Sequence, residues 1–230
     1  MMKNKIQYII TFILFLVSAN YAFAQDAIID ALKSEAARAK DKLEIAGSEK
    51  PYYICYSVFD TRKVDIEAAY GGLIKSKNKL ARNGQAEVRV GDYSFDQTNY
   101  SNSYLAITRG RFTLPLQDDP FALKYEIWLV TDQQFKTSLD ELAQKKSGIK
   151  TRTFSEKIDD FSKEEPQKQI EEKNNTDIDI KSLEGKAILY SGLFKNFPHI
   201  QKSVVLFDCE KGNEYFVNSE GTSIRKPVNK

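Results

Sequence analysis

The sequence predicts an α+β fold, in which an antiparallel or mixed sheet packs against a long central helix and an N-terminal helix. The first observation is the stretch Leu114–Lys145, whose apolar residues recur at helical spacing. The second is the two-residue period of strands in residues 51–60 and 86–93. The third is the mixed order of helices and strands with hairpin-type joins, which favours an antiparallel sheet.

Residues 1–24 are predicted to be a signal peptide and not part of the fold. Lysines precede the apolar run 9–17, and residues 22–24 have the A-x-A form of a cleavage site. We expect the mature chain to begin at Gln25 and the protein to be exported to a periplasmic or extracellular location. An uncleaved anchor is the alternative, although the run is short for a membrane span.

The leader accounts for the net charge of the chain. The whole sequence has 34 Lys and Arg against 32 Asp and Glu, and the leader holds two of the lysines. The mature chain therefore has 32 residues of each sign. A balanced chain gives no reason to expect nucleic acid as a partner, or a membrane after signal cleavage.

The first half of the mature chain is expected to contain one helix and three strands. The helix covers Asp26–Ala46, and the aromatic and β-branched stretch 51–60 follows as a strand covered on both sides. Asp60–Lys63 is predicted to be a turn into a second strand, 64–74. Lys75–Gly84 is predicted to be a basic, polar loop.

The third strand, residues 86–93, has the clearest half-buried pattern. Ala86, Val88 and Val90 point one way, and the charged residues between them point the other way. Asp92–Arg111 lacks a period and is rich in Asn, Ser, Tyr and Asp. We expect a long surface loop there.

The central helix has both a start and a stop signal. Asp119 can cap the first turn, and Pro120 suits the first helical position. Lys145 suits the negative end of the helix dipole, and Gly148 is expected to end the helix. The expected buried stripe consists of Leu123, Ile127, Trp128, Thr131, Phe135, Leu139 and Leu142.

The last third of the chain begins with the charged segment 151–179, which is predicted to be a partly disordered linker. A short helix is expected over 180–194. Two strands, 201–208 and 214–218, are expected to be joined by a turn at Glu210–Asn213.

The chain ends in the start of a further strand. Residues 223–228 would leave a bare sheet edge that invites pairing. The expected organisation is thus a signal peptide (1–24), an α+β core (25–150), a linker (151–179), and a helix with strands that continue the same domain (180–230).

Few residues are candidates for chemistry. The glycines never form a G-x-G-x-x-G, P-loop or G-x-S-x-G pattern. His199 is the only histidine, and Cys55 and Cys209 are the only cysteines. A zinc site or a Cys/His hydrolase would need these three residues together, and their spacing gives no support for either. Export permits a disulfide between the cysteines but does not establish one.

Four aspartates and two aromatic stretches have alternative interpretations. The aspartates could form paired carboxylates or a calcium site, but their positions suit turns, strand ends and a helix cap. They are Asp92, Asp96, Asp118 and Asp119. Aromatic residues in 52–59 and 93–104 could line a peptide groove, although aromatic strand faces are more often core.

A family resemblance is carried by five stretches that, together with the spacing between them, cover about Ala31–Thr222. They are EKPYYICYSVFD, AEVRVGDYSFDQTNY, LPLQDDPFALKYEIWLVTDQQFKTSLDELAQKK, IDDFSKEEP and YFVNSEGT. In this order and spacing they resemble the amino-terminal half of TldD/PmbA-type proteins, zinc metallopeptidases once described as modulators of DNA gyrase. None of the five is a catalytic motif.

The resemblance implies a non-catalytic role for this chain. The family's zinc is attributed to an HExxxH helix and a later Cys, both beyond this region, and the sequence has no HExxxH. We therefore assign no catalytic, cofactor-binding or metal residue here, and expect zinc only in the missing carboxy-terminal part. We expect the chain to be a truncated lobe that is inactive alone. This lobe would help to enclose a peptide cleft and would pair with a TldD/PmbA-type subunit. The alternative is a free-standing accessory protein that pairs with a zinc-bearing relative through the edge at residues 223–228.

Overall fold

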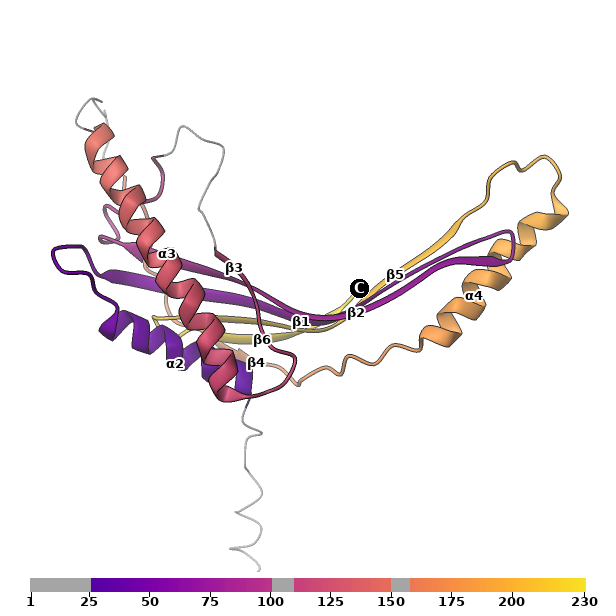
Figure 1. The fold of residues 1–230 in the computed structure, drawn as a ribbon, viewed down its shortest axis with the longest axis horizontal. Helices are drawn as coiled ribbons and strands as arrows, with labels where there is room; N and C mark the ends of the chain where they lie inside the picture. The colour runs from indigo at the N-terminus through magenta and orange to yellow at the C-terminus, as the bar shows by residue number, and fades with distance from the viewer. Residues whose placement is uncertain (1–25, 101–109, 150–157) are drawn as a thin grey trace, which may run out of the picture.

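The fold was examined in a computed structural model, which describes residues 26–100, 110–149 and 158–230 (Figure 1). The predicted signal peptide and parts of the predicted loop and linker lie outside these ranges. The helices are α2 (Ala27–Lys42), α3 (Pro120–Ile149), α4 (Ile180–Gly192) and the short 3-10 helix η1 (Leu193–Asn196). The strands are β1 (Pro51–Ala69), β2 (Gly72–Val90), β3 (Gly110–Thr113), β4 (Lys168–Ile170), β5 (Val205–Asn218) and β6 (Ser223–Asn229).

The strands form one six-stranded sheet in the order β3-β2-β1-β5-β6-β4. Only the β4–β6 pair is parallel. The helices α2 and α3 pack on the sheet together with buried residues of β1, β2 and β5. The predicted α+β class, with a mostly antiparallel sheet and a long helix packed on it, is confirmed.

A long hairpin gives the molecule its extended shape. β1 and β2 have 19 residues each and meet at the turn Tyr70–Gly71. Together with β5 they run from α2 and α3 at one end to α4 at the other (Figure 1). We call the α2 and α3 end the body, and residues 64–80 with 178–209 the arm.

Three segments that the sequence predicts to be turns or loops are instead inside strands. Asp60–Lys63 belongs to β1, Lys75–Gly84 to β2 and Glu210–Asn213 to β5. Thr61 pairs with Ala81 on one side and with Gly212 on the other, so the backbone is hydrogen-bonded in register. These three predictions were wrong because polar side chains do not break a strand whose backbone is hydrogen-bonded in register to a neighbouring strand.

Both cores lie on the same face of β1. Ile54, Tyr56 and Val58 belong to the core of the body, and residues 64, 66 and 68 belong to the core of the arm. All have even numbers, and alternate residues of a strand share a face. The odd face of β1 therefore points away from the helices.

The helix α3 begins as predicted, but its buried stripe and its end differ. The Asp119 side chain accepts a hydrogen bond from the Ala122 amide at 2.7 Å, as a cap does. Leu123, Ile127, Thr131, Phe135 and Leu142 are buried, whereas Trp128 is 39% exposed. Gly148 lies inside the helix and does not end it. The predicted buried stripe thus included one residue, Trp128, that faces outward.

The described part of the predicted linker is in contact with the sheet. β4 pairs with residues 223–225 of β6. Flanking bonds from the Ser223 amide to the Gln167 carbonyl, and from the Glu171 amide to the Arg225 carbonyl, extend this pairing. The edge at residues 223–228, predicted to be bare, is thus partly covered by the same molecule. Within the described ranges no helix is long and apolar enough to cross a membrane.

Gly212 should be the glycine of the sheet that is most sensitive to substitution. Its φ is +156°, and a Cβ there would lie 2.1 Å from the carbonyl oxygen of Asp60 on β1. We expect Gly212→Ala to lower the free energy of unfolding by about 1–3 kcal/mol. The matched control is Gly185→Ala in α4, where a Cβ meets nothing within 4 Å. That change should raise stability by about 0.5–1 kcal/mol. Urea unfolding followed by far-UV circular dichroism measures both, and equal effects would contradict the close approach.

Candidate functional site

A groove lies where β1, β2 and β3 run side by side. Its volume is about 480 Å³. Two cross-strand rows of the sheet supply most of its lining, one through Ser57, Gln85 and Arg111, the other through Phe59, Asn83 and Thr113. Gly84 and Phe112 complete it.

The groove combines polar groups with one aromatic surface. Ser57 and Phe59 have odd numbers, so they lie on the face of β1 that points away from the helices. Asn83, Gln85 and Arg111 are exposed, and the ring of Phe59 is 37% exposed. Amide, hydroxyl and guanidinium groups beside a ring can bind a peptide through hydrogen bonds and apolar contact. The lining residues include no His, Cys, Asp, Glu or Lys, so they offer binding without a nucleophile and base.

Gly84 leaves room for an aromatic ring next to the backbone of β2. A Cβ on Gly84 would lie 2.3 Å from the ring of Phe112. That ring fills the space a side chain would take, and Phe112 also packs against the core of the body. A larger residue at position 84 would therefore displace β3 from β2.

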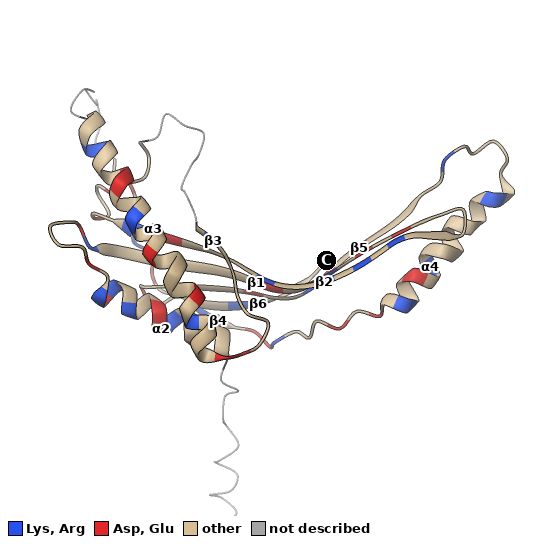
Figure 2. Cartoon of the chain, viewed as in Figure 1, with Lys and Arg blue, Asp and Glu red and all other residues tan. Residues whose placement is uncertain are grey.

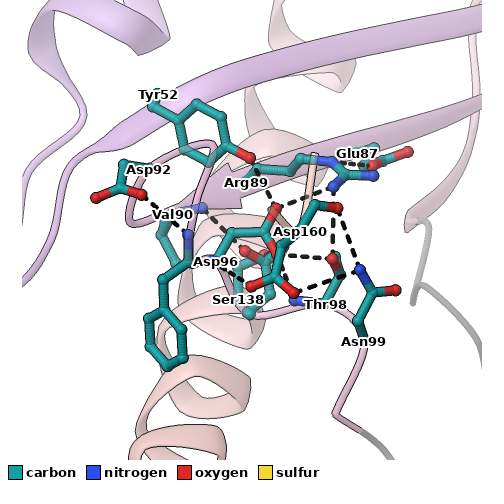
Figure 3. Close-up of polar contacts among 12 residues, drawn as sticks. Tyr52, Glu87, Arg89, Val90, Asp92, Asp96, Thr98, Asn99, Ser138 and Asp160 are labelled. Carbon is teal, nitrogen blue, oxygen red and sulfur yellow. Dashed lines mark hydrogen bonds and ion pairs between the residues drawn. The ribbon is translucent and has the colours of Figure 1, made fainter. Parts of the chain in front are cut away.

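The second candidate is a buried ion-pair network at the body end of β2 (Figure 3). Its centre is Arg89, whose Nε lies 2.6 Å from a carboxylate oxygen of Glu87 and whose Nη1 lies 2.9 Å from one of Asp96. The Tyr52 hydroxyl donates to Asp96 at 2.7 Å. The guanidinium carbon also lies 3.9 Å from the ring centre of Phe161. The cation is thus enclosed by two carboxylates and a ring.

A second ion pair ties the end of α3 to the same network. The Lys145 ammonium, on a residue 4% exposed, pairs with Asp160 and donates to the Thr98 carbonyl at 2.7 Å. Asp160 in turn accepts from the Asp96 amide at 3.0 Å. Figure 3 shows Asp160 facing Asp96, Thr98 and Asn99. Segments far apart in the chain therefore meet around these two cations.

A glutamine in the segment after β2 hydrogen-bonds to β2 in place of another strand. The Gln97 side chain accepts from the Val90 amide at 3.0 Å and donates to the Val88 carbonyl at 2.9 Å. The Ser138 hydroxyl of α3 donates to the same carbonyl at 2.7 Å. Asp96, Gln97 and Thr98 are buried. The prediction of a surface loop was therefore wrong for this part of 92–111.

The network fixes the charge of its members. Burial alone would raise the pKa of Asp96, but hydrogen bonds from Thr98, Tyr52 and Arg89 outweigh it and hold that pKa below its usual value. Burial, and then the bond to Asp96, raise the pKa of Tyr52. Neither group changes its charge near neutral pH. We interpret the network as structural, with the role of holding residues 92–99 and 158–161 on β2 and α3.

The candidate residues from the sequence are not brought together. Cys209 pairs in register with Val64, nine residues along β1 from Cys55. At about 3.3 Å per strand residue the cysteines are about 30 Å apart, too far for a disulfide within one chain. His199 is exposed in the segment between η1 and β5. The described residues therefore provide no Cys/His pair at Cys55.

The four aspartates have the local roles that their positions suggest. Asp92 accepts from the Ser94 and Phe95 amides in a turn. Asp118 pairs with Arg82 at 2.7 Å, and Asp119 caps α3. Only Asp96 is at a place that the sequence did not indicate, inside the network around Arg89.

The groove and the two buried cations were missed by sequence reasoning. Residues 83–84 were predicted to be in a loop, so no surface could be assigned there. Arg89 was placed on the exposed face of its strand because it alternates with apolar residues, and Lys145 was assigned only to the negative end of the helix dipole. One signal was available: Asp159 and Asp160 precede the aromatic Phe161 in an otherwise polar segment.

Comparisons with known proteins found likenesses of fold only. No family model and no curated protein matches the chain. The chain is similar to TldE from Thermococcus kodakarensis, with 14% identity and a TM-score of 0.44 over 88% of this chain and 37% of that one. It is also similar to a protein described as a modulator of a DNA gyrase from Thermotoga maritima, with 11% identity and a TM-score of 0.39 over 77% and 33%. The chain thus spans about a third of each structure.

Proposed function

We propose that this chain is the non-catalytic, peptide-binding lobe of an exported TldD/PmbA-type metallopeptidase. The groove of β1, β2 and β3 carries the proposal, because it offers hydrogen-bonding groups and a ring but no catalytic pair. The five stretches of sequence that resemble the family support it. Zinc and its ligands would belong to a part of the enzyme that this chain does not contain, and a TldD/PmbA-type subunit would pair with it.

The short strand β3 suits a peptide-binding edge. It is the edge strand of the sheet, has four residues and contributes Arg111 and Thr113 to the groove. An extended peptide can add to such an edge through backbone hydrogen bonds, with side chains in the adjoining groove. On the other side of the sheet, residues 167–174, which include the edge strand β4, cover much of β6. This covering weakens the alternative of an accessory protein that pairs through residues 223–228.

Phe59→Ala should weaken peptide binding by about fivefold or more, because exposed aromatic residues in a groove commonly dominate binding energy. The measurement is fluorescence anisotropy of fluorescein-labelled casein peptides titrated with residues 25–230, which include every described element. The matched control is Phe121→Ala, a phenylalanine that is 79% exposed on α3 and outside the groove. If the two variants bound the peptides with equal affinity, the groove would not be the binding site.

The lack of catalysis has its own test. The pure chain is expected not to hydrolyse casein, with or without a chelator. Chelator-sensitive hydrolysis by the pure chain would contradict the non-catalytic assignment, whatever the result with Phe59→Ala.

A further inference from the structure

The end of the arm exposes more apolar surface than a surface helix normally does. In α4 only Ala187 and Ser191 are buried. Leu189 is 62% exposed, and after the helix Leu193 and Phe197 are 56% and 57% exposed. Ile188, Tyr190, Phe194, Val204 and Leu206 are exposed as well. Exposed apolar surface gathered in one place, rather than scattered, marks an interaction site.

The hairpin turn belongs to the same surface. The Gly71 amide donates to the Ser191 hydroxyl at 3.0 Å, and the Tyr70 hydroxyl donates to the Ile200 carbonyl at 2.8 Å. Next to this turn, Leu73 and Ile74 are 43% and 60% exposed. The apolar surface therefore continues from α4 onto the tip of the hairpin.

Charge is segregated toward this end of the molecule. Residues 68–82 and 185–207 contain no Asp or Glu. Figure 2 shows blue without red from the far half of α4 through the segment that follows it. The lysines in these two ranges are Lys75, Lys77, Lys79, Lys186, Lys195 and Lys202. The balanced charge of the chain as a whole conceals this positive end.

The six lysines differ in how far acidic residues offset their charge. Lys75 and Lys77 lie opposite Glu67 and Asp65 in register, so their charge is partly offset. Lys186, Lys195 and Lys202 are exposed on α4, η1 and the following segment, and no acidic residue lies between Glu184 and Asp208. In the sequence they are interspersed with the exposed residues Leu189, Leu193 and Phe197.

We propose that the end of the arm binds the surface of an anionic lipid bilayer. Leucine and phenylalanine side chains would enter the headgroup region, and the three lysines would contact acidic headgroups. A lipid surface is favoured because it offers acidic headgroups above an apolar interior, which matches lysines beside exposed apolar side chains with no acidic residue among them. The proposal does not depend on the peptide groove, which lies on the body.

Sedimentation with vesicles tests the proposal. Residues 25–230 are mixed with vesicles of equal parts phosphatidylcholine and phosphatidylglycerol, and separately with phosphatidylcholine alone. We expect binding to the acidic vesicles and much weaker binding to the neutral ones. At about fivefold per lysine, Lys186→Gln/Lys195→Gln/Lys202→Gln should reduce binding by about a hundredfold.

A matched variant controls for charge alone. Lys33, Lys40 and Lys42 are exposed on α2 at the body end, and changing all three to glutamine makes the same change in net charge. This variant should bind acidic vesicles as the unchanged chain does. Equal losses in the two triple variants would overturn the assignment to the arm. Failure of the unchanged chain to bind acidic vesicles would overturn the proposal itself.

Contact with the bilayer can be followed at one residue. In Trp128→Phe/Phe197→Trp the single indole is at the end of the arm. Its emission should shift to the blue on addition of acidic vesicles and not on addition of neutral ones. No shift in the presence of bound protein would overturn insertion. Self-association of the chain that is lost in Leu189→Ser/Leu193→Ser, without vesicle binding, would show that a second copy covers this surface instead.

Discussion

Arg89→Leu is expected to lower the free energy of unfolding by about 3–5 kcal/mol at neutral pH. Arg89 is 5% exposed and is the cation that pairs with Glu87 and Asp96, which are 5% and 0% exposed. Leucine would leave both carboxylates buried without it, and a buried charge that loses its partner is costly. Urea unfolding followed by the fluorescence of Trp128, which lies in the body, measures the change.

The pH dependence of this loss separates charge from packing. Because the pKa of Asp96 is lowered in the folded chain, its contribution is present above the unfolded-state pKa and is lost as pH falls through the folded pKa. In the variant, fewer interactions offset the burial of the charged Asp96 carboxylate. Protonation of this carboxyl group at low pH therefore relieves part of the loss of stability. The difference between the two proteins should therefore narrow below about pH 4. If the difference in stability between the two proteins did not change with pH, the loss would be due to packing and not to charge.

A surface ion pair provides the control. Lys136 pairs with Asp132 at 2.6 Å on α3, and its side chain is 59% exposed. Lys136→Leu should change stability by less than about 1 kcal/mol. A loss as large as that of Arg89→Leu would show that removal of any cation, buried or not, destabilises this protein.

The sequence was informative where a local pattern decides the structure. The start of α3 was predicted correctly because the cap at Asp119 and the proline after it act within one turn. The strand through Val88 was predicted because its period is local. α2 was also predicted, although it ends four residues before Ala46.

The sequence was not informative where distant segments decide. Arg89 alternates with apolar residues and reads as exposed, but residues 158–161 return to cover it. The polar stretch 75–84 reads as a loop, yet β1 on one side and, at residues 83–84, β3 on the other make it a strand. The groove could not be foreseen for the same reason, since one of its two rows crosses that stretch at Asn83 and the other passes next to it at Gln85. The positive apolar end of the arm requires the hairpin and α4 to meet, which no local pattern reports.

Phe135→Ala in α3 is expected to lower the free energy of unfolding by about 3–5 kcal/mol. Phe135 is 0% exposed and belongs to the core formed by α2, α3 and the sheet. Truncation removes its buried ring and leaves a cavity that the surrounding helices and strands can fill only in part. Urea unfolding with Trp128 fluorescence reports the loss.

The same helix supplies the comparison that makes this result specific. Phe121 is 79% exposed near the start of α3, so Phe121→Ala should change stability by no more than about 0.5 kcal/mol. The helical pattern placed Phe135, but not Phe121, among the buried residues, and it wrongly placed Trp128 there as well. If both variants lost equal stability, α3 would be packed on more than one side, and the outward face described for Trp128 would be incorrect. If only Phe135→Ala lowers the free energy of unfolding, the body is held by one face of α3, and the apolar residues on its other face do not contribute to folding.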